Sequence, residues 1–135
     1  MKLRSTRHAV YNINYHLVWI PKYRKNILVG EVESRLKEIF QDTAKQYGFD
    51  ILGMEIMPDH IHLFVSAPPR WSPAEIVKKF KGISGSKLFL EFPELRKELR
   101  KGKIWTRSYY VGTAGTVTAE TIRKYIDEQK KKQAE

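Results

Sequence analysis

Cysteine is absent from this chain of 135 residues, and so is any run of about eighteen apolar residues. Without cysteine, the protein can form neither disulfide bonds nor thiolate metal sites. The missing apolar run argues against a membrane-spanning helix, and the start at Met1–Arg4 has no signal-peptide pattern. We therefore expect a single soluble domain over residues 1–135, located in the cytoplasm and without a membrane partner.

A phosphate-binding loop of the form G-x-x-x-x-G-K-[ST] is also missing, and we expect no nucleotide cofactor. Acidic residues are scarce, since 15 Asp and Glu stand against 25 Lys and Arg and leave a formal net charge of +10. This excess favours a polyanionic partner, most obviously nucleic acid, with binding that weakens in salt. The alternative is a basic surface that serves only solubility.

Two short clusters of basic residues and two aromatic residues are candidates for nucleic-acid contacts. Such a surface combines cations along the backbone with aromatic rings that stack on bases. For the aromatic pair, packing against the sheet is the alternative, and a run of lysines on a helix is also typical of a solvated face. The candidates are Lys22, Arg24 and Lys25 in a loop, Lys78, Lys79 and Lys81 on a helix, and Trp105 and Tyr109.

Hydrophobic periodicity predicts an alternation of strands and helices along the chain. Gly48 is expected to end the first helix, a capping box at Ser72–Glu75 to begin the second, and Gly82 and Gly85 to interrupt it. Pro58-Asp59 is too short a connection for anything but an antiparallel pair. The expected strands are 9–20, 49–57, 60–67 and 104–111, and the expected helices are 32–47, one from Ser72, a short one at 94–100 and one from Thr118.

The element order βαββαβα predicts an α+β fold of the ferredoxin-like or RRM-like class. In this class an antiparallel sheet carries helices on one face, and here the last helix is appended. Gly112 to Gly115 is expected to break the chain before that helix and to act as a hinge. The sequence shows no internal repeat.

His60-Ile61-His62 and the pair Tyr125 and Gln129 are the most informative residues. Side chains alternate along a strand, so both imidazoles share one face and could grip a metal ion. Positions four apart lie on one side of a helix, where a phenol and a carboxamide would arrive together. Taken singly, the histidines could be a polar face and Tyr125 a core residue. Their conjunction in a small basic chain favours metal-assisted phosphoryl transfer.

At this point the chain resembles the single-tyrosine transposases of the HUH nuclease superfamily, which are encoded by insertion sequences that move as single-stranded DNA. Four segments in the same order carry the resemblance. They are Tyr15–Trp19 with Pro21–Arg24, Met57–Phe64, Trp105–Gly112 and Tyr125–Gln129.

The resemblance implies that His60, His62 and Gln129 are metal ligands and that Tyr125 is the nucleophile. It further implies a 5′-phosphotyrosyl intermediate, a free 3′ hydroxyl and a substrate of single-stranded DNA with hairpins near the element ends. A homodimer is implied as well, in which each Tyr125 helix serves the partner's histidines. Neutral ligands of this kind would leave three positions of an octahedral Mg²⁺ or Mn²⁺ ion for water and phosphate oxygen.

Three other functions remain open from the sequence. A noncatalytic RRM-like binding module needs only basic charge and strand aromatics. A replication initiator or relaxase would use the same histidine motif, although relaxases place their tyrosine before the histidines. A zinc hydrolase would leave Tyr125 without a role. His16 is expected to be a structural histidine rather than part of the site.

Overall fold

The computed structural model describes residues 3–99, 102–113 and 124–128. The predicted start of the last helix at Thr118, the glycine at 115 and the proposed ligand Gln129 lie outside these ranges. The strands are β1 (Arg4–Ser5), β2 (Val10–Tyr11), β3 (Asn14–Trp19), β4 (Asp50–Met57), β5 (His60–Ser66) and β6 (Tyr110–Thr113). The helices are α1 (Gly30–Tyr47), α2 (Pro73–Glu91) and α3 (Glu94–Glu98), with a 3-10 turn at Lys22–Arg24 and a helical segment at 124–128.

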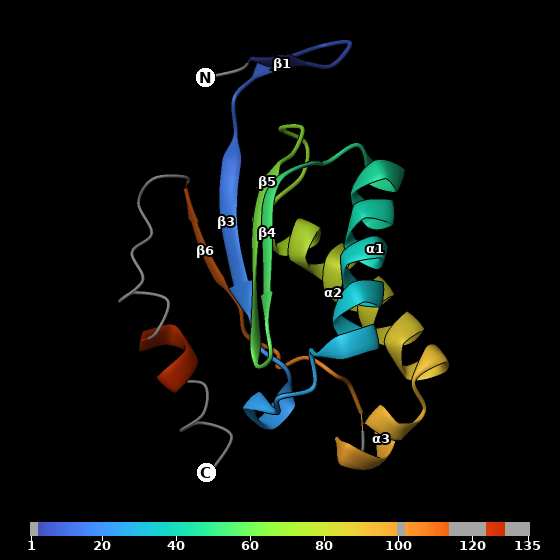
Figure 1. The fold of residues 1–135 in the computed structure, drawn as a ribbon. Helices are drawn as coiled ribbons and strands as arrows, with labels where there is room; N and C mark the ends of the chain where they lie inside the picture. The colour runs from blue at the N-terminus through green and yellow to red at the C-terminus, as the bar shows by residue number, and fades with distance from the viewer. Residues whose placement is uncertain (1–2, 100–101, 114–123, 129–135) are drawn as a thin grey trace.

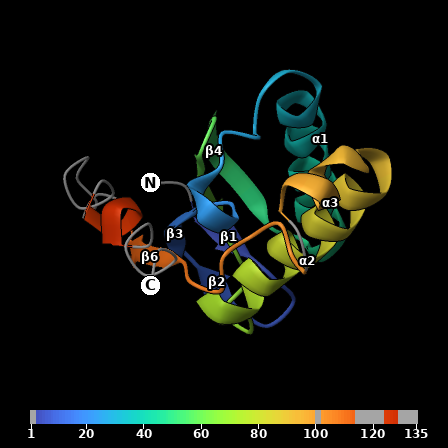
Figure 2. The ribbon, with the colours of Figure 1, turned by 90° about the horizontal axis from the view of Figure 1, so that it is seen from below.

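A four-stranded antiparallel sheet in the order β4-β5-β3-β6 forms the centre of the molecule. Helices α1 and α2 cover one face of the sheet, and the helical segment 124–128 lies on the other side (Figure 1). The view from below shows the same separation (Figure 2). The predicted class, an antiparallel sheet with helices packed on one face, is confirmed.

The main core lies between the sheet and the two long helices. Strand β5 sends Ile61, Leu63 and Val65 into this core, where none of the three is exposed. The rings of Trp19 and Phe40 meet edge to face at 5.8 Å. Because side chains alternate along β5, this packing leaves His60 and His62 on the opposite face.

Local chemistry sets the helix boundaries that were expected. Gly48 ends α1 in the left-handed conformation with φ of 75°, where a residue with a Cβ would be strained. Ser72 begins α2 with a complete capping box, in which its hydroxyl accepts from the Glu75 amide at 3.1 Å and Glu75 accepts from the Ser72 amide at 3.0 Å. None of the described helices is long and apolar enough to cross a membrane.

The strand predicted over residues 9–20 is divided in two. Val10 and Tyr11 form β2, which pairs with β1 in a hairpin that stands beyond the main sheet (Figure 1). The chain joins the main sheet only at Asn14. The alternation of apolar residues in the sequence continues through the break, so the pattern could not show where the pairing partner changes.

Helix α2 is continuous through Gly82 and Gly85, so the predicted interruption is wrong. Each glycine costs roughly 1 kcal/mol relative to alanine. Buried side chains from both halves of the helix, including Ile76, Phe80 and Leu88, offset that cost by packing into the core. A Cβ at Gly85 would lie 3.8 Å from Cδ1 of Trp105, an ordinary van der Waals distance, so packing does not require glycine there.

The strand predicted over residues 104–111 begins only at Tyr110 and extends to Thr113. Before it, Trp105 forms a single bridge with Pro21, and the Lys81 ammonium donates to the carbonyls of Thr106 and Ser108 at 2.7 and 2.8 Å. Between this bridge and β6, the Lys81 side chain of α2 therefore holds the segment in place of strand pairing. Gly112, expected to break the chain, lies inside β6.

Candidate active site

His60 and His62 lie side by side on the sheet face away from α1 and α2. Their ring centroids are 5.0 Å apart with 70° between the planes. Both side chains are partly exposed, while Ile61 between them is fully buried. The predicted two-point arrangement of imidazoles on one strand face is therefore present.

Asp59 holds the ring of His60. Its Oδ1 lies 2.8 Å from Nδ1 of His60, and its Oδ2 accepts from Nε of Arg24 at 2.7 Å. Burial opposes ionisation of this carboxyl, but the hydrogen bonds from His60 and Arg24 outweigh it and lower the pKa of Asp59. In the neutral ring, a carboxylate on Nδ1 selects the tautomer in which the lone pair of Nε2 is available to a metal ion.

His16 holds the ring of His62. Nε2 of His16 lies 3.1 Å from Nδ1 of His62, and the His16 ring stacks on Phe64 at 4.1 Å. His16 is only 3% exposed. Its expected role was structural, but the structure places it inside the site. In the sheet, His16 lies on the same strand face as Val18, which pairs with His62.

The tautomers of His16 and His62 are linked through this contact. For His62 to bind a metal through Nε2, its Nδ1 must carry the proton and donate to Nε2 of His16. His16 must then be protonated at Nδ1, which is buried and has no described partner. Burial lowers the pKa of His16, and burial with the neighbouring charges of His60 and His16 lowers the pKa of His62 to about 4. Both rings are thus neutral at pH 7, as metal ligation requires.

Tyr125 lies on the helical segment that packs on this same face. Its ring centroid is 6.4 Å from that of Tyr110 on β6. In the sheet, Tyr110 pairs with Val18, which pairs on its other side with His62. The three therefore form one row across β6, β3 and β5, with neighbouring strands about 4.8 Å apart.

The phenol oxygen of Tyr125 is buried and makes no hydrogen bond to the described residues. Burial raises the pKa of Tyr125, and the nearby hydroxyls of Ser108 and Thr106 offset only part of that rise. A nucleophilic phenol with a raised pKa needs assistance to lose its proton. The residues around Tyr125 therefore do not activate its phenol.

Arg24 links the Tyr125 segment to the histidines. Its Nη1 donates to Oδ1 of Asp127 at 3.0 Å, while its Nε binds Asp59. Arg24 was a candidate DNA contact, but two carboxylates of the chain itself already match its charge. Among the described residues, no third His, Cys, Asp or Glu completes a metal site with the pair. The expected third ligand, Gln129, lies outside the described ranges.

The aromatic candidates for DNA contact are not open stacking platforms. Trp105 is 4% exposed, donates from Nε1 to Ser84 at 2.9 Å and meets Trp19 edge to face. Tyr109 is half-buried against the core, and the Lys81 ammonium lies 5.8 Å from its ring. The alternative weighed for both residues was packing against the sheet. Both rings do pack against the core, but from a segment that is folded onto α2.

The three lysine candidates on α2 are divided between two sides of that helix. Lys79 lies over the Tyr47 ring of α1 at 5.0 Å, whereas Lys78 and Lys81 line a groove of about 570 Å³ between α2 and residues 102–109. Burial lowers the pKa of Lys81 to about 8, and Lys103 nearby adds to that effect. Lys22 and Lys25 lie at the 3-10 turn after β3.

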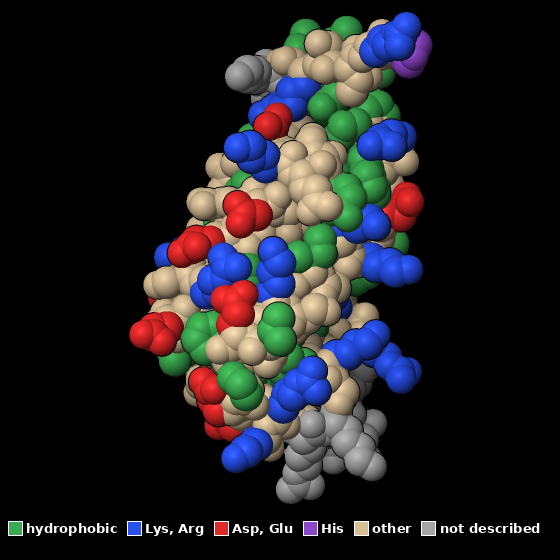
Figure 3. Space-filling view, turned by 90° about the vertical axis from the view of Figure 1, so that its right-hand side faces the viewer, with side chains coloured by type: hydrophobic (Ala, Val, Ile, Leu, Met, Phe, Trp, Pro, Cys, Tyr) green, Lys and Arg blue, Asp and Glu red, His purple; other side chains and the backbone are tan. Residues whose placement is uncertain are grey.

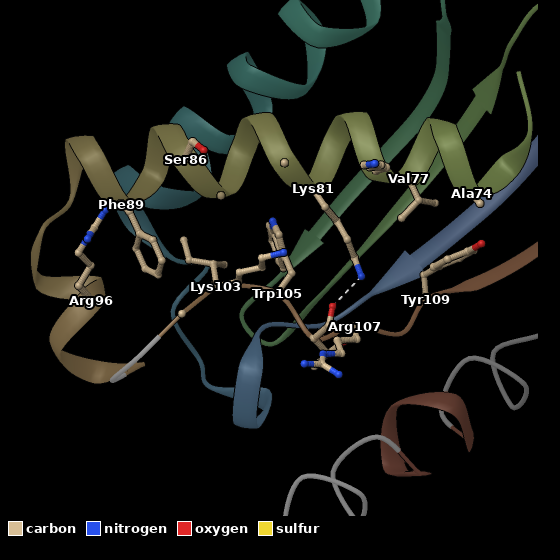
Figure 4. A pocket seen from close by; sticks show the side chains of 16 residues that line it. Ala74, Val77, Lys81, Ser86, Phe89, Arg96, Lys103, Trp105, Arg107 and Tyr109 are labelled. Atoms are coloured by element: carbon tan, nitrogen blue, oxygen red, sulfur yellow. Dashed lines mark hydrogen bonds between the residues drawn. The ribbon is translucent and has the colours of Figure 1, made fainter.

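The charged side chains among the described residues that line this groove are all basic (Figure 4). Its lining includes five cationic side chains and no Asp or Glu among the described residues. Acidic and basic side chains are interspersed on the surface of the helical side, so the positive net charge is not distributed evenly over that surface (Figure 3). The five are Lys78, Lys81, Arg96, Lys103 and Arg107.

Sequence comparison shows which known proteins this chain is similar to. The family model "Transposase IS200 like" matches residues 9–129. ISDra2 transposase TnpA of Deinococcus radiodurans is 41% identical over 133 residues, which cover 98% of this chain and 95% of that protein. The transposase for insertion sequence element IS200 of Salmonella typhimurium is 34% identical over 126 residues, covering 93% and 82%.

Solved structures agree with the sequence comparison. A crystal structure assigned to a transposase of Deinococcus radiodurans superposes with a TM-score of 0.86 at 39% identity, covering 93% of this chain and 97% of that one. A REP-associated tyrosine transposase bound to a REP hairpin superposes with a TM-score of 0.55 at 12% identity, covering 92% and 68%, which supports the fold alone. With the family model matched over most of its length, the chain belongs to the IS200-like transposases, enzymes of DNA transposition.

Proposed function

We propose that this transposase cuts and rejoins single-stranded DNA at the ends of an insertion sequence, with Tyr125 as the nucleophile. One observation carries the proposal: the Tyr125 segment packs on the same sheet face as His60 and His62. A binding module of the RRM type would have no use for two adjacent imidazoles whose Nδ1 atoms each contact a side chain of the chain itself, Asp59 and His16.

The residues fit a divalent metal ion. His60 and His62 would hold it through Nε2, with Gln129 as the expected third ligand. When bound, Mg²⁺ or Mn²⁺ supplies positive charge near the nonbridging phosphate oxygens and fixes the orientation of the phosphate. Asp59 and His16 keep the two rings in the required tautomer and orientation.

In the proposed reaction, the Tyr125 oxygen attacks the phosphorus in line with the leaving oxygen. A phosphotyrosyl bond to the 5′ phosphate forms, and the broken bond leaves a free 3′ hydroxyl. Attack by a DNA hydroxyl on that intermediate then rejoins strands and releases Tyr125. Each step exchanges one phosphodiester for another, so no nucleotide cofactor is required.

The basic groove beside α2 is proposed to hold part of the DNA. Its five cations would neutralise phosphates. The groove adjoins the proposed nucleophile, because Thr106 lines it and also lies near the Tyr125 phenol. Hairpin DNA is the proposed substrate, a proposal supported by the fold shared with a transposase bound to a REP hairpin. The cytoplasm is the proposed location, since the substrate is cellular DNA.

A homodimer with shared sites is proposed for the active form. The structure shows the Tyr125 segment bound to its own chain, through Tyr110 and Arg24. Exchange of this segment between two copies would preserve those contacts in trans. Mixing Tyr125→Phe with His60→Ala subunits should then restore cleavage at one site of each heterodimer. Absence of rescue after proven subunit exchange would place each site within one chain.

The central experiment uses a labelled single-stranded oligonucleotide that carries a subterminal hairpin from DNA flanking the gene. With Mg²⁺ or Mn²⁺, wild type should form a covalent adduct that survives denaturing electrophoresis, and excess EDTA should abolish it. Tyr125→Phe should bind the hairpin with near-normal affinity but form no adduct, since only the attacking oxygen is lost. An adduct formed by Tyr125→Phe would assign the nucleophile elsewhere.

A further inference from the structure

Arg24 occupies an unusual backbone position in the 3-10 turn that follows β3. Tyr23 and Arg24 have φ values of 60° and 50°, in the left-handed region that residues with a Cβ seldom adopt. Consecutive residues persist there only where the surrounding structure holds them. For Arg24, two ion pairs provide such restraint, to Asp59 and to Asp127.

The guanidinium of Arg24 joins two parts of the site that are far apart in sequence. Asp59 receives Nε at 2.7 Å and holds His60 with its other oxygen. Asp127 receives Nη1 at 3.0 Å and lies two residues after Tyr125. One planar group thus contacts the carboxylate that orients a metal-binding histidine and the segment that carries the nucleophile.

The two ends of this link differ in their exposure. The side chain of Asp59 is 20% exposed and that of Arg24 27%, whereas that of Asp127 is 56% exposed. The Arg24–Asp59 pair is therefore a fixed part of the sheet face, and Asp127 is the weaker, more readily broken contact. Tyr125 and Asp127 lie about 200° apart around the helix axis, so contacts to Tyr110 and Arg24 hold the segment from two sides.

We infer that Arg24 is a positioning residue that seats the Tyr125 segment and orients His60 with the same side chain. This inference rests on the proposed function, because it assigns Arg24 a role toward the proposed nucleophile and metal ligand. Lysine cannot replace it, since an ammonium lacks the planar fork that reaches two carboxylates from separate nitrogens. Docking of the nucleophile and readiness of the metal site are then coupled through one group.

Hydrogen–deuterium exchange of the full-length, metal-free chain tests whether Arg24 seats the Tyr125 segment, and it needs no activity assay. Arg24→Lys and Asp127→Asn should each speed exchange of residues 124–128 by about fivefold, the expected size for loss of one partly exposed ion pair. The double variant should exchange no faster than Arg24→Lys alone. Lys25→Ala removes a charge from the same loop and Glu128→Gln one from the same helix, and both should match wild type.

Calorimetric titration with Mn²⁺ alone tests the other part of the inference, that Arg24 orients His60. Arg24→Lys should weaken binding by about tenfold, the lower end of what loss of a partner behind a metal ligand costs, while Lys25→Ala should leave it unchanged. Wild-type exchange at 124–128 in Asp127→Asn, or wild-type Mn²⁺ affinity in Arg24→Lys, would overturn the inference. If wild type fails to cleave DNA, the proposed function fails, yet the exchange result still decides whether Arg24 seats the segment.

Discussion

On strand β5, Ile61, Leu63 and Val65 point into the main core, whereas His60 and His62 point to the opposite face of the sheet, the face on which the Tyr125 segment packs. The first face is packed with aliphatic and aromatic side chains from α1 and α2. The second holds charged and titratable groups matched in pairs, such as Asp59 with His60. Neighbouring residues on one strand therefore divide stability from chemistry, and substitutions at adjacent positions should separate the two.

The largest expected effect is on the second face. His62→Ala should reduce cleavage at least about a thousandfold, because a metal ion contributes several kcal/mol to transition-state stabilisation. The thermal midpoint should change little, since the ring is partly exposed and outside the main core. A labelled hairpin oligonucleotide measures the first quantity and circular dichroism the second. Near-normal cleavage by His62→Ala would break the proposed division.

The adjacent residue should give the opposite result. Leu63→Ala removes a fully buried side chain from the core and should lower the free energy of unfolding by about 3 kcal/mol. Denaturant unfolding measures that loss. Cleavage per folded molecule, assayed well below the lowered midpoint, should stay within a few-fold of wild type. A variant that keeps its stability but loses cleavage would show that the faces are coupled.

His16 sharpens the comparison, because it is buried yet belongs to the chemical face. His16→Phe keeps an aromatic ring beside Phe64 but removes the acceptor for His62, and Mn²⁺ affinity should fall by about 10–100-fold. Saturating Mn²⁺ should recover most of the cleavage rate. The matched control is His8→Ala in the exposed N-terminal hairpin, and this variant should bind Mn²⁺ with wild-type affinity.

The pH dependence of stability should reveal His62. Its pKa is lowered from 6.5 to about 4 in the folded protein, so between these values the unfolded chain binds a proton that the folded chain does not. The free energy of unfolding should therefore decrease as pH falls from about 6.5 to about 4. His62→Gln should flatten this part of the profile. An identical slope in wild type and variant would assign the dependence to other groups.

The smallest effect is expected on the helical side. Lys78→Ala removes one cation from the groove and should lower the slope of log affinity for hairpin DNA against log salt by about 1. Lys79→Ala is the matched control, since its ammonium lies over the Tyr47 ring instead. Equal slopes for the two variants would remove the groove from the proposed DNA-binding surface.

Much of the fold could be predicted because its signals are local. Gly48 and the Ser72 capping box are set by nearest neighbours in sequence, and so is the turn at Pro58-Asp59 that places the histidines at the start of β5. The alternation His60, Ile61, His62 fixed the face of each ring once β5 was identified. These features required no knowledge of distant residues.

The rest depends on contacts between distant residues. His16 and His62 are 46 positions apart, and Arg24 and Asp127 are 103 apart. No local pattern marks such pairs. From the sequence, His16 was expected to be a structural residue and Arg24 a DNA contact. The continuity of α2 through Gly82 and the irregular path of residues 104–109 likewise depend on packing and on Lys81, which overrode local propensity.

Strand β3 is hydrogen bonded on both sides, to β5 and β6, and its alternate residues serve opposite faces. One inserted or deleted residue would move His16 into the position of a core residue and Leu17 out of the core, while shifting the register with both neighbours. Insertions and deletions inside β3 should therefore abolish activity, whereas those in the hairpin of β1 and β2 should be tolerated. For an engineer who wishes to attach a peptide tag or a second domain, that hairpin is the permissive site.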